Sequence, residues 1–99
     1  ETIRDIFKVS TAGSRALDLF GDNIVNGTYE KTIFACSHMH KDVDLFMNLN
    51  NELKMPSLMS TVTHQFFNSA MKKGYGPKDM SVVAAVIEEF ADQKIQTPK

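Results

Sequence analysis

Cysteine is nearly absent from this chain of 99 residues, tryptophan is missing, and long apolar runs do not occur. The single cysteine, Cys36, excludes a disulfide within the chain and favours a reducing compartment, so we expect a cytoplasmic protein. No apolar stretch approaches the roughly 20 residues that a membrane-spanning helix needs. No signal peptide is visible, because the first residues are charged and compatible with a helix. These features argue against a disulfide-stapled secreted domain and against a membrane span.

The sequence also lacks an excess of either charge and any phosphate-binding glycine motif. A net charge of −1 provides no electrostatic basis for binding nucleic acid or an anionic membrane, and it disfavours a DNA-binding helical domain. No Gly-x-Gly-x-x-Gly occurs, and Gly74-Tyr75-Gly76-Pro77 has neither the preceding strand nor the spacing of such a loop. We therefore expect no dinucleotide-binding sheet in this polypeptide.

Helical periodicity is present throughout, and no window shows a sustained alternation of apolar and polar residues. The pattern predicts one domain, residues 1–99, folded as an all-α, compact bundle of about five helices. Helices are expected from Glu1 to about Val9, from Ser14 as N-cap through Phe20, from Phe34 to Leu53, from Ser57 to the break at Gly74, and from Asp79 or Ser81 onward. In the last helix the expected buried stripe consists of Val83, Val86, Ile87 and Phe90.

The longest segment without proline or glycine, residues 34–53, is predicted to be the central helix of the core. Its apolar positions cover about half of the helix circumference, which is wider than a surface helix needs. They are Ala35, Met39, Val43, Phe46, Leu49 and Leu53. Asp42 falls inside this apolar arc, where a buried carboxylate needs a partner. Asp42 is therefore either a structural acceptor or, with Lys41 beside it, part of a surface that faces a ligand or another domain.

Several residues are of types that bind metals or cofactors in other proteins, but their spacing in this sequence does not predict a site. Cys36 and His40 share one face of a helix, whereas His38 points away, so no metal site is predicted from these three. His64 has no identifiable partner. The methionines at helical core positions are either packing residues or the lining of an interaction groove; they are Met39, Met47, Met59, Met71 and Met80.

One combination of motifs resembles a known family. Phe34, then Lys41-Asp42 on a helix, then Pro56 resembles the C-terminal domain of the β-hydroxyacid dehydrogenases, which include 3-hydroxyisobutyrate dehydrogenase, tartronate semialdehyde reductase and L-threonate dehydrogenase. The family signature Lys-Asp-Leu-Gly-x-Ala-x-Asp corresponds to residues 41–48, where only the Lys-Asp pair is kept. Asp44 replaces the usual small residue, Phe46 the alanine and Asn48 the second aspartate.

The resemblance implies a fold like the C-terminal domain of 6-phosphogluconate dehydrogenase, a more distant relative. It implies a parent enzyme that uses NAD or NADP and a small hydroxy acid, with this domain closing the cleft and contributing to a dimer. Lys41 would contact the nicotinamide half of the cofactor or the bound acid, while Phe34 and Asp42 would line the substrate cleft. The general-acid lysine of the family would lie upstream of Glu1, so this chain alone would hold no catalytic residue, bind no cofactor and be inactive.

The resemblance also implies that some apolar surface is uncovered here, because the long interdomain helix of such enzymes is not encoded. An alternative is a free-standing helical protein-interaction module without redox chemistry. The sequence does not choose between NAD and NADP, does not name the hydroxy acid, and leaves open whether the parent enzyme is active with the altered signature.

Overall fold

The computed structural model describes residues 1–95, and every regular element in that range is helical. The elements are α1 (Thr2–Lys8), α2 (Arg15–Asn26), α3 (Cys36–Glu52), α4 (Leu58–Lys72), the 3₁₀ turn η1 (Met80–Val82) and α5 (Val83–Ala91). Within these residues the one extended pairing is an isolated bridge between Ala35 and Asp79. The predicted all-α fold of about five helices is confirmed. None of the helices between residues 1 and 95 combines the length and apolar character needed to cross a bilayer.

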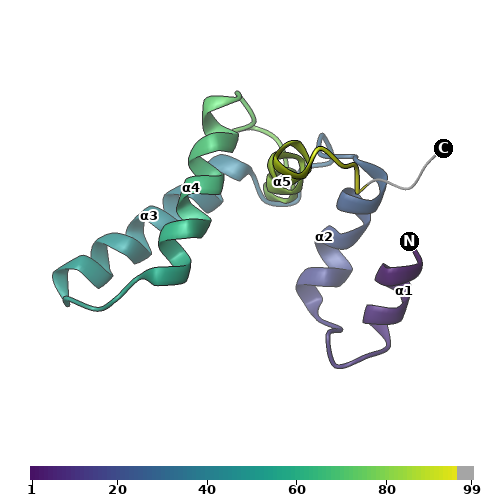
Figure 1. Ribbon diagram of the computed structural model, residues 1–99, viewed down its shortest axis with the longest axis horizontal. Coiled ribbons are helices and arrows are strands. Elements are labelled where there is room, and N and C mark those ends of the chain that lie inside the picture. Colours follow the sequence, from purple (N-terminus) through teal and green to yellow (C-terminus); the bar gives the residue numbers. More distant parts are fainter. Residues whose placement is uncertain (96–99) are drawn as a thin grey trace.

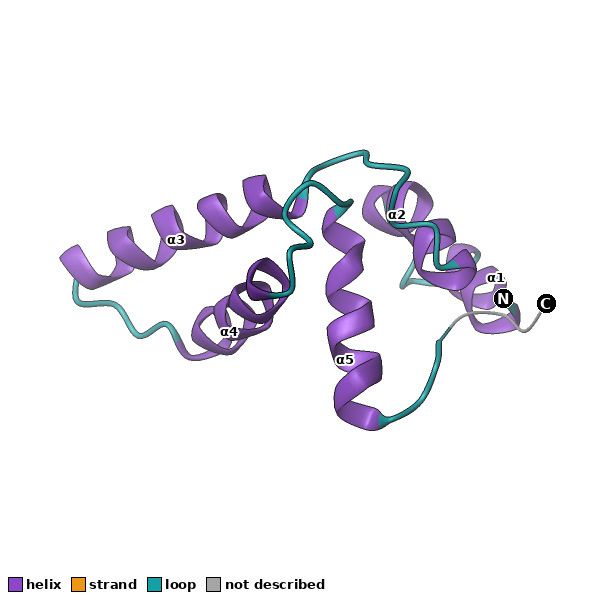
Figure 2. Cartoon of the chain, turned by 90° about the horizontal axis from the view of Figure 1, so that it is seen from above, coloured by secondary structure: helices purple, strands orange, loops and turns teal. Residues whose placement is uncertain are grey.

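The helices are arranged around α5. In Figure 1, α3 and α4 form a hairpin that projects to one side of α5, while α2 and α1 lie on the other side. Figure 2 shows the same order from above, with α5 between the two pairs. The turn η1 contacts α2, α3 and α5, so it joins the two sides of the molecule. The outer part of the hairpin consequently has few neighbours besides its own two helices.

The most buried apolar side chains gather at this junction, and we call this group the central core. It consists of Tyr29, Cys36, Phe67, Ala70, Val82 and Val86. They come from the α2–α3 connection, the first turn of α3, the second half of α4, and the η1–α5 segment. The central core therefore fixes the position where α3 begins, and with it every residue proposed above for the ligand cleft.

A buried carboxylate, Asp79, holds this junction together. Its side chain accepts hydrogen bonds from the backbone N–H of Ile33 (2.8 Å) and Phe34 (3.1 Å), and from both the N–H and the hydroxyl of Ser81. Its own N–H donates to the carbonyl of Tyr29 (2.8 Å). Burial raises the pKa of Asp79, but the hydrogen bonds from Ser81, Phe34 and Ile33 outweigh burial, and the net pKa lies below its ordinary value.

The second helix is longer than its sequence predicts. Ser14 caps it as expected, accepting from the Leu17 N–H at 3.0 Å, but the predicted end after Phe20 is wrong. Gly21 lies inside the helix, where a Cβ would come within 3.0 Å of a methyl carbon of Leu17 in the same helix and within 3.9 Å of Arg4 Cγ in α1. The helix ends instead at Gly27, which adopts φ +66° and donates to the Asn23 carbonyl.

The prediction that residues 34–53 form the central helix of the core is also wrong. Only Cys36 and Asn50 of α3 are buried, whereas Phe46 is 53% exposed and Leu49 is 51% exposed. The physical reason is that, among residues 1–95, no further helix covers the outer half of the hairpin. The predicted uncovered apolar surface is therefore present, and it lies on this helix pair.

The buried stripe predicted for α5 is partly wrong. Val86 is buried, but Ile87 is 45% exposed and Phe90 is 85% exposed. Because η1 precedes α5, the side that faces the central core carries Val82 and Val86, one turn apart. Phe90 lies beside this face and contacts the ring of Phe66 edge-on, with ring centroids 6.1 Å apart.

Candidate functional site

An apolar groove begins beside the central core, where α2, α3 and η1 meet. Its first stretch is a depression of about 400 Å³, a size that suits a small ligand. The lining residues are Leu19, Phe20, Ile33, Phe34, Met39, Asp42 and Met80. The structure therefore brings Phe34 and Asp42, the two residues predicted to line a substrate cleft, to the same depression.

A second stretch of the groove continues along the hairpin and shares Met39 and Asp42 with the first. It is lined from α3, from the connection to α4 and from the first turns of α4; its other residues are Val43, Phe46, Asn50, Pro56, Ser57, Leu58, Met59, Ser60 and Thr63. Met39, Met59 and Met80 thus line the groove rather than only filling the core. Asp42 is the one charged side chain at the boundary of the two stretches.

Phe34 is positioned by the junction described above. Its N–H donates to the buried carboxylate of Asp79 (3.1 Å), and its carbonyl accepts from the Met80 N–H (2.7 Å). Its ring contacts the imidazole of His38 edge-on, with centroids 5.8 Å apart. The backbone at Phe34 is therefore held from both sides, and the ring forms a fixed wall of the groove.

Lys41 and Asp42 occupy successive positions in the second turn of α3, and both are exposed. Among residues 1–95, no carboxylate lies within ion-pair distance of Lys41, and no hydrogen bond links Lys41 to Asp42. The ammonium group of Lys41 is thus accessible to an anion, while Asp42 is the one charged residue that lines a mostly apolar groove. The pair lies on the exposed side of α3 and not against the central core.

Cys36, His38 and His40 do not come together. Cys36 is fully buried in the central core, and both burial and the negative charge of Asp79 raise the pKa of its thiol. His38 is exposed beside Phe34, and His40 faces α4. These three side chains therefore do not converge on one point.

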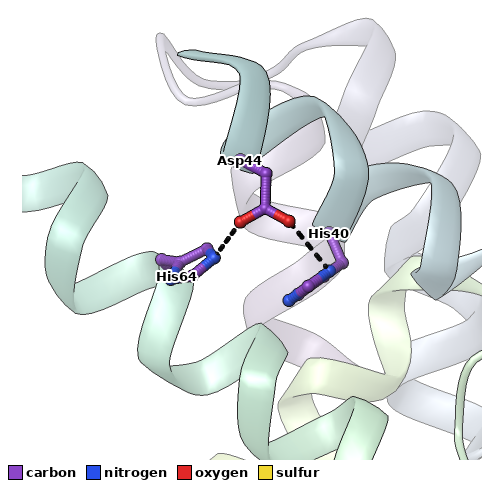
Figure 3. A group of neighbouring side chains, drawn as sticks. All are labelled: His40, Asp44 and His64. Atoms are coloured by element: carbon purple, nitrogen blue, oxygen red, sulfur yellow. Dashed lines mark hydrogen bonds and ion pairs between the residues drawn. The ribbon is translucent and has the colours of Figure 1, made fainter. Parts of the chain in front are cut away.

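A polar cluster that the sequence analysis missed joins α3 to α4. Asp44, which replaces the small residue of the family signature, contacts His64 of α4 through one carboxylate oxygen and lies 3.5 Å from His40 Nδ1 through the other (Figure 3). The two imidazole rings stack, with centroids 5.2 Å apart. His64, for which the sequence identified no partner, is thus partnered by Asp44. A usable signal was present, because His40 and Asp44 are four residues apart on a helix whose partner helix carries His64.

Comparison with known proteins identifies one family. Residues 1–87 match the family described as NAD-binding of NADP-dependent 3-hydroxyisobutyrate dehydrogenase. No curated protein sequence matches the chain. The match covers most of the chain and includes Phe34, Lys41 and Asp42, so the resemblance carried by these residues is confirmed at the level of the family.

Proposed function

Because the chain belongs to the 3-hydroxyisobutyrate dehydrogenase family, we propose that it is the C-terminal helical domain of an NAD- or NADP-dependent 3-hydroxyacid dehydrogenase. In this proposal the domain closes the active-site cleft and contributes to a dimer. The observation that carries it is the placement of Phe34 and Asp42 on one depression, with Lys41, which has no ion-pair partner among residues 1–95, next to Asp42 on α3.

Each of the three residues has a role that its surroundings support. Lys41 provides an accessible positive charge for the carboxylate of a hydroxy acid or for a cofactor phosphate. Phe34 presents a fixed apolar ring that excludes water from the reacting carbon. Asp42 accepts a hydrogen bond from a ligand hydroxyl or from a neighbouring chain at the boundary of the groove.

The described residues fit one side of a nicotinamide site and not a complete one. Residues 1–95 contain no β-sheet and no glycine-rich loop between a strand and a helix, which are the elements that hold a pyrophosphate. When bound, the nicotinamide supplies the hydride acceptor for alcohol oxidation. This chain's own residues would orient the acid through Lys41 and exclude water through Phe34, while the proton-transferring lysine belongs to another segment of the parent enzyme.

The test is the activity of a full-length parent protein toward a panel of short 3-hydroxy acids. Lys41→Ala is expected to lower kcat/KM by roughly tenfold or more, the effect of losing one charge-assisted hydrogen bond to an anion. Lys72→Ala, which removes an exposed lysine from the last turn of α4, serves as the matched control and should leave the kinetics unchanged. Unchanged kinetics in Lys41→Ala would remove that residue from the site.

The 99-residue chain alone is proposed to be inactive and to bind no nicotinamide cofactor. Fluorescence titration of the chain with NADH and NADPH tests this, and no saturable binding is expected. Micromolar binding of either cofactor would show that the helical domain holds the nucleotide itself, and our division of roles between domains would be wrong.

The dimer role is supported by the apolar side chains that line the outer groove. Phe46 is 53% exposed, and Leu58 and Met59 are each 80% exposed. Contiguous apolar surface of this kind is typical of an interface. Sedimentation of the chain should show concentration-dependent self-association that Phe46→Ser weakens, whereas a monomer at the highest concentrations would contradict the dimer role.

A free-standing protein-interaction module is the second candidate, and the methionine-lined groove is the observation that favours it. The two candidates differ in the parent reading frame. A dinucleotide-binding motif and a glycine-rich segment with a lysine encoded upstream of Glu1 would support the enzyme, and their absence from the natural gene would support the module. Under either candidate we propose a reducing, cytoplasmic location, which the free buried thiol of Cys36 supports.

A further inference from the structure

The cluster of His40, Asp44 and His64 offers three metal-binding groups from two helices. One ligand atom from each residue lies within 4.8 Å of the others. The imidazoles are largely shielded, with 21% and 16% of the His40 and His64 side chains exposed, and the carboxylate is 43% exposed. Figure 3 shows the two rings directed toward the same carboxylate.

Asn68 contacts both rings: its amide oxygen accepts from His40, and its amide nitrogen lies 3.4 Å from His64 Nδ1. His40 Nε2 lies 2.6 Å from the amide oxygen of Asn68, so this nitrogen carries the hydrogen and donates it. In the neutral ring the lone pair of His40 is then on Nδ1, which faces a carboxylate oxygen of Asp44 at 3.5 Å. Two acceptors that face each other at this distance are stabilised by a cation between them.

We propose that His40 Nδ1, His64 Nε2 and the carboxylate of Asp44 bind a Zn²⁺ ion between α3 and α4. Zinc–ligand bonds of about 2.0–2.2 Å in a tetrahedron place neighbouring ligand atoms about 3.4 Å apart, close to the 3.5 Å between His40 Nδ1 and Asp44. Two imidazoles and one carboxylate suit zinc better than magnesium or calcium, which prefer oxygen ligands alone. Asn68 acts as the outer hydrogen-bond partner that holds His40 in the ligating tautomer.

Binding through His64 Nε2 requires this nitrogen to give up the hydrogen that it shares with Asp44: a neutral ring moves the hydrogen to Nδ1, and a protonated ring releases one proton to solvent. In either case Nδ1 then carries a hydrogen, so the Asn68 amide nitrogen, 3.4 Å from Nδ1, has to shift when zinc binds. Three protein ligands leave a fourth position for water, as in open zinc sites. The ion would join the two helices in the middle of a hairpin whose outer half has little buried apolar surface. Its principal effect would therefore be to stabilise the hairpin.

The test is titration of the 99-residue chain with ZnCl₂ near neutral pH, followed by calorimetry and by thermal unfolding. One zinc ion per chain is expected, with a rise in Tm that EDTA reverses. Asp44→Asn and His64→Gln should each abolish the rise in Tm, while His38→Gln, which removes an exposed histidine outside the cluster, should bind like the unaltered chain. Circular dichroism of each variant without zinc checks that it is folded.

Cobalt(II) provides a readout that needs no variant. Bound at this site, Co²⁺ should produce the intense visible absorption of a four-coordinate ion, and Zn²⁺ should displace it. The proposal is overturned if zinc binds equally well to His64→Gln, if His38→Gln abolishes binding, or if neither metal binds the unaltered chain at about 100 μM, a concentration far above the dissociation constants usual for protein zinc sites.

Discussion

Two phenylalanines of the α3–α4 hairpin have opposite surroundings. Phe67, in the second half of α4, is 7% exposed and belongs to the central core, whereas Phe46, in the second half of α3, is 53% exposed and lines the outer groove. Both lie on helices with apolar faces, so helix periodicity does not distinguish them. What differs is the number of elements within reach: the junction is covered by α2, η1 and α5, and the outer hairpin only by itself.

This contrast separates the residues that stabilise the fold from those available to a ligand or partner. The apolar side chains of the central core are enclosed by the chain, and the carboxylate of Asp79 is hydrogen-bonded within it. The outer groove, which Asp42 lines, leaves apolar area exposed, and Lys41 beside Asp42 on α3 has no ion-pair partner among residues 1–95. Matched substitutions in the two regions test this division.

The largest difference is expected between Phe67→Ala and Phe46→Ala. The first leaves a cavity in the central core and should lower the free energy of unfolding by about 3–5 kcal/mol, while the second removes a half-exposed ring and should cost less than about 1 kcal/mol. Urea denaturation followed by circular dichroism measures both. Equal losses would mean that the outer groove is as well packed as the core.

The next comparison is between two aspartates. Asp79→Asn places an NH₂ group against the N–H of Ser81 or the N–H groups of Ile33 and Phe34, and should destabilise the chain by about 2–4 kcal/mol. Asp42→Asn changes an exposed carboxylate and should stay within about 0.5 kcal/mol of the unaltered chain. A small loss for Asp79→Asn would show that its hydrogen bonds are replaced by water.

Acid should destabilise the fold in part by protonating the carboxylate of Asp79. Because the pKa of Asp79 is lower in the folded than in the unfolded chain, its contribution to stability is complete above the unfolded value of about 3.9 and is lost as the pH falls through the folded value. Urea denaturation at a series of pH values from about 6 to 2 measures this loss. Asp79→Asn should show a shallower decline over the acid part of that range, and a parallel decline would exclude Asp79 as a source of the pH dependence.

The smallest effects are expected at two helix ends with positive φ. Gly27 ends α2 on the core side with φ +66°, and Gly27→Ala should cost about 1 kcal/mol. Lys54 adopts φ +55° in the hairpin connection, so Lys54→Gly should leave stability unchanged or raise it by up to about 1 kcal/mol. In thermal unfolding, Gly27→Ala should lower Tm, whereas Lys54→Gly should leave Tm unchanged or raise it. A lower Tm in both variants would show that the Lys54 side chain makes stabilising contacts of its own.

Local sequence signals predicted where the helices lie, but they predicted poorly which elements pack against each helix. Ser14 and the glycine-proline break after α4 mark helix ends through their own backbone chemistry, so they are readable without tertiary structure. Gly21 misled the prediction because it lies inside α2, against Leu17 of the same helix and near Arg4 of α1, and does not end the helix. The exposure of Phe46 depends on whether another helix covers the hairpin, and helix periodicity does not contain that information.

Part of the candidate site was also predicted from the sequence, and part was not. Phe34 and Asp42 were selected through the family resemblance, and the structure places both on one groove. The cluster of His40, Asp44 and His64 required knowing that α3 and α4 face each other at those turns. Asp79 was considered only as a helix start, because the backbone donors that surround it come from a loop 45 residues earlier.

The buried position of Cys36 has a practical consequence. As the single thiol of the chain, fully enclosed and with its N–H donating to the Lys78 carbonyl, it meets a reagent only when the first turn of α3 detaches. The rate at which a disulfide reagent modifies the native protein would therefore measure how often that detachment occurs, without any added label. If the same measurement is repeated with a bound ligand or partner, a slower modification rate would show that binding suppresses the local opening that exposes the Cys36 thiol.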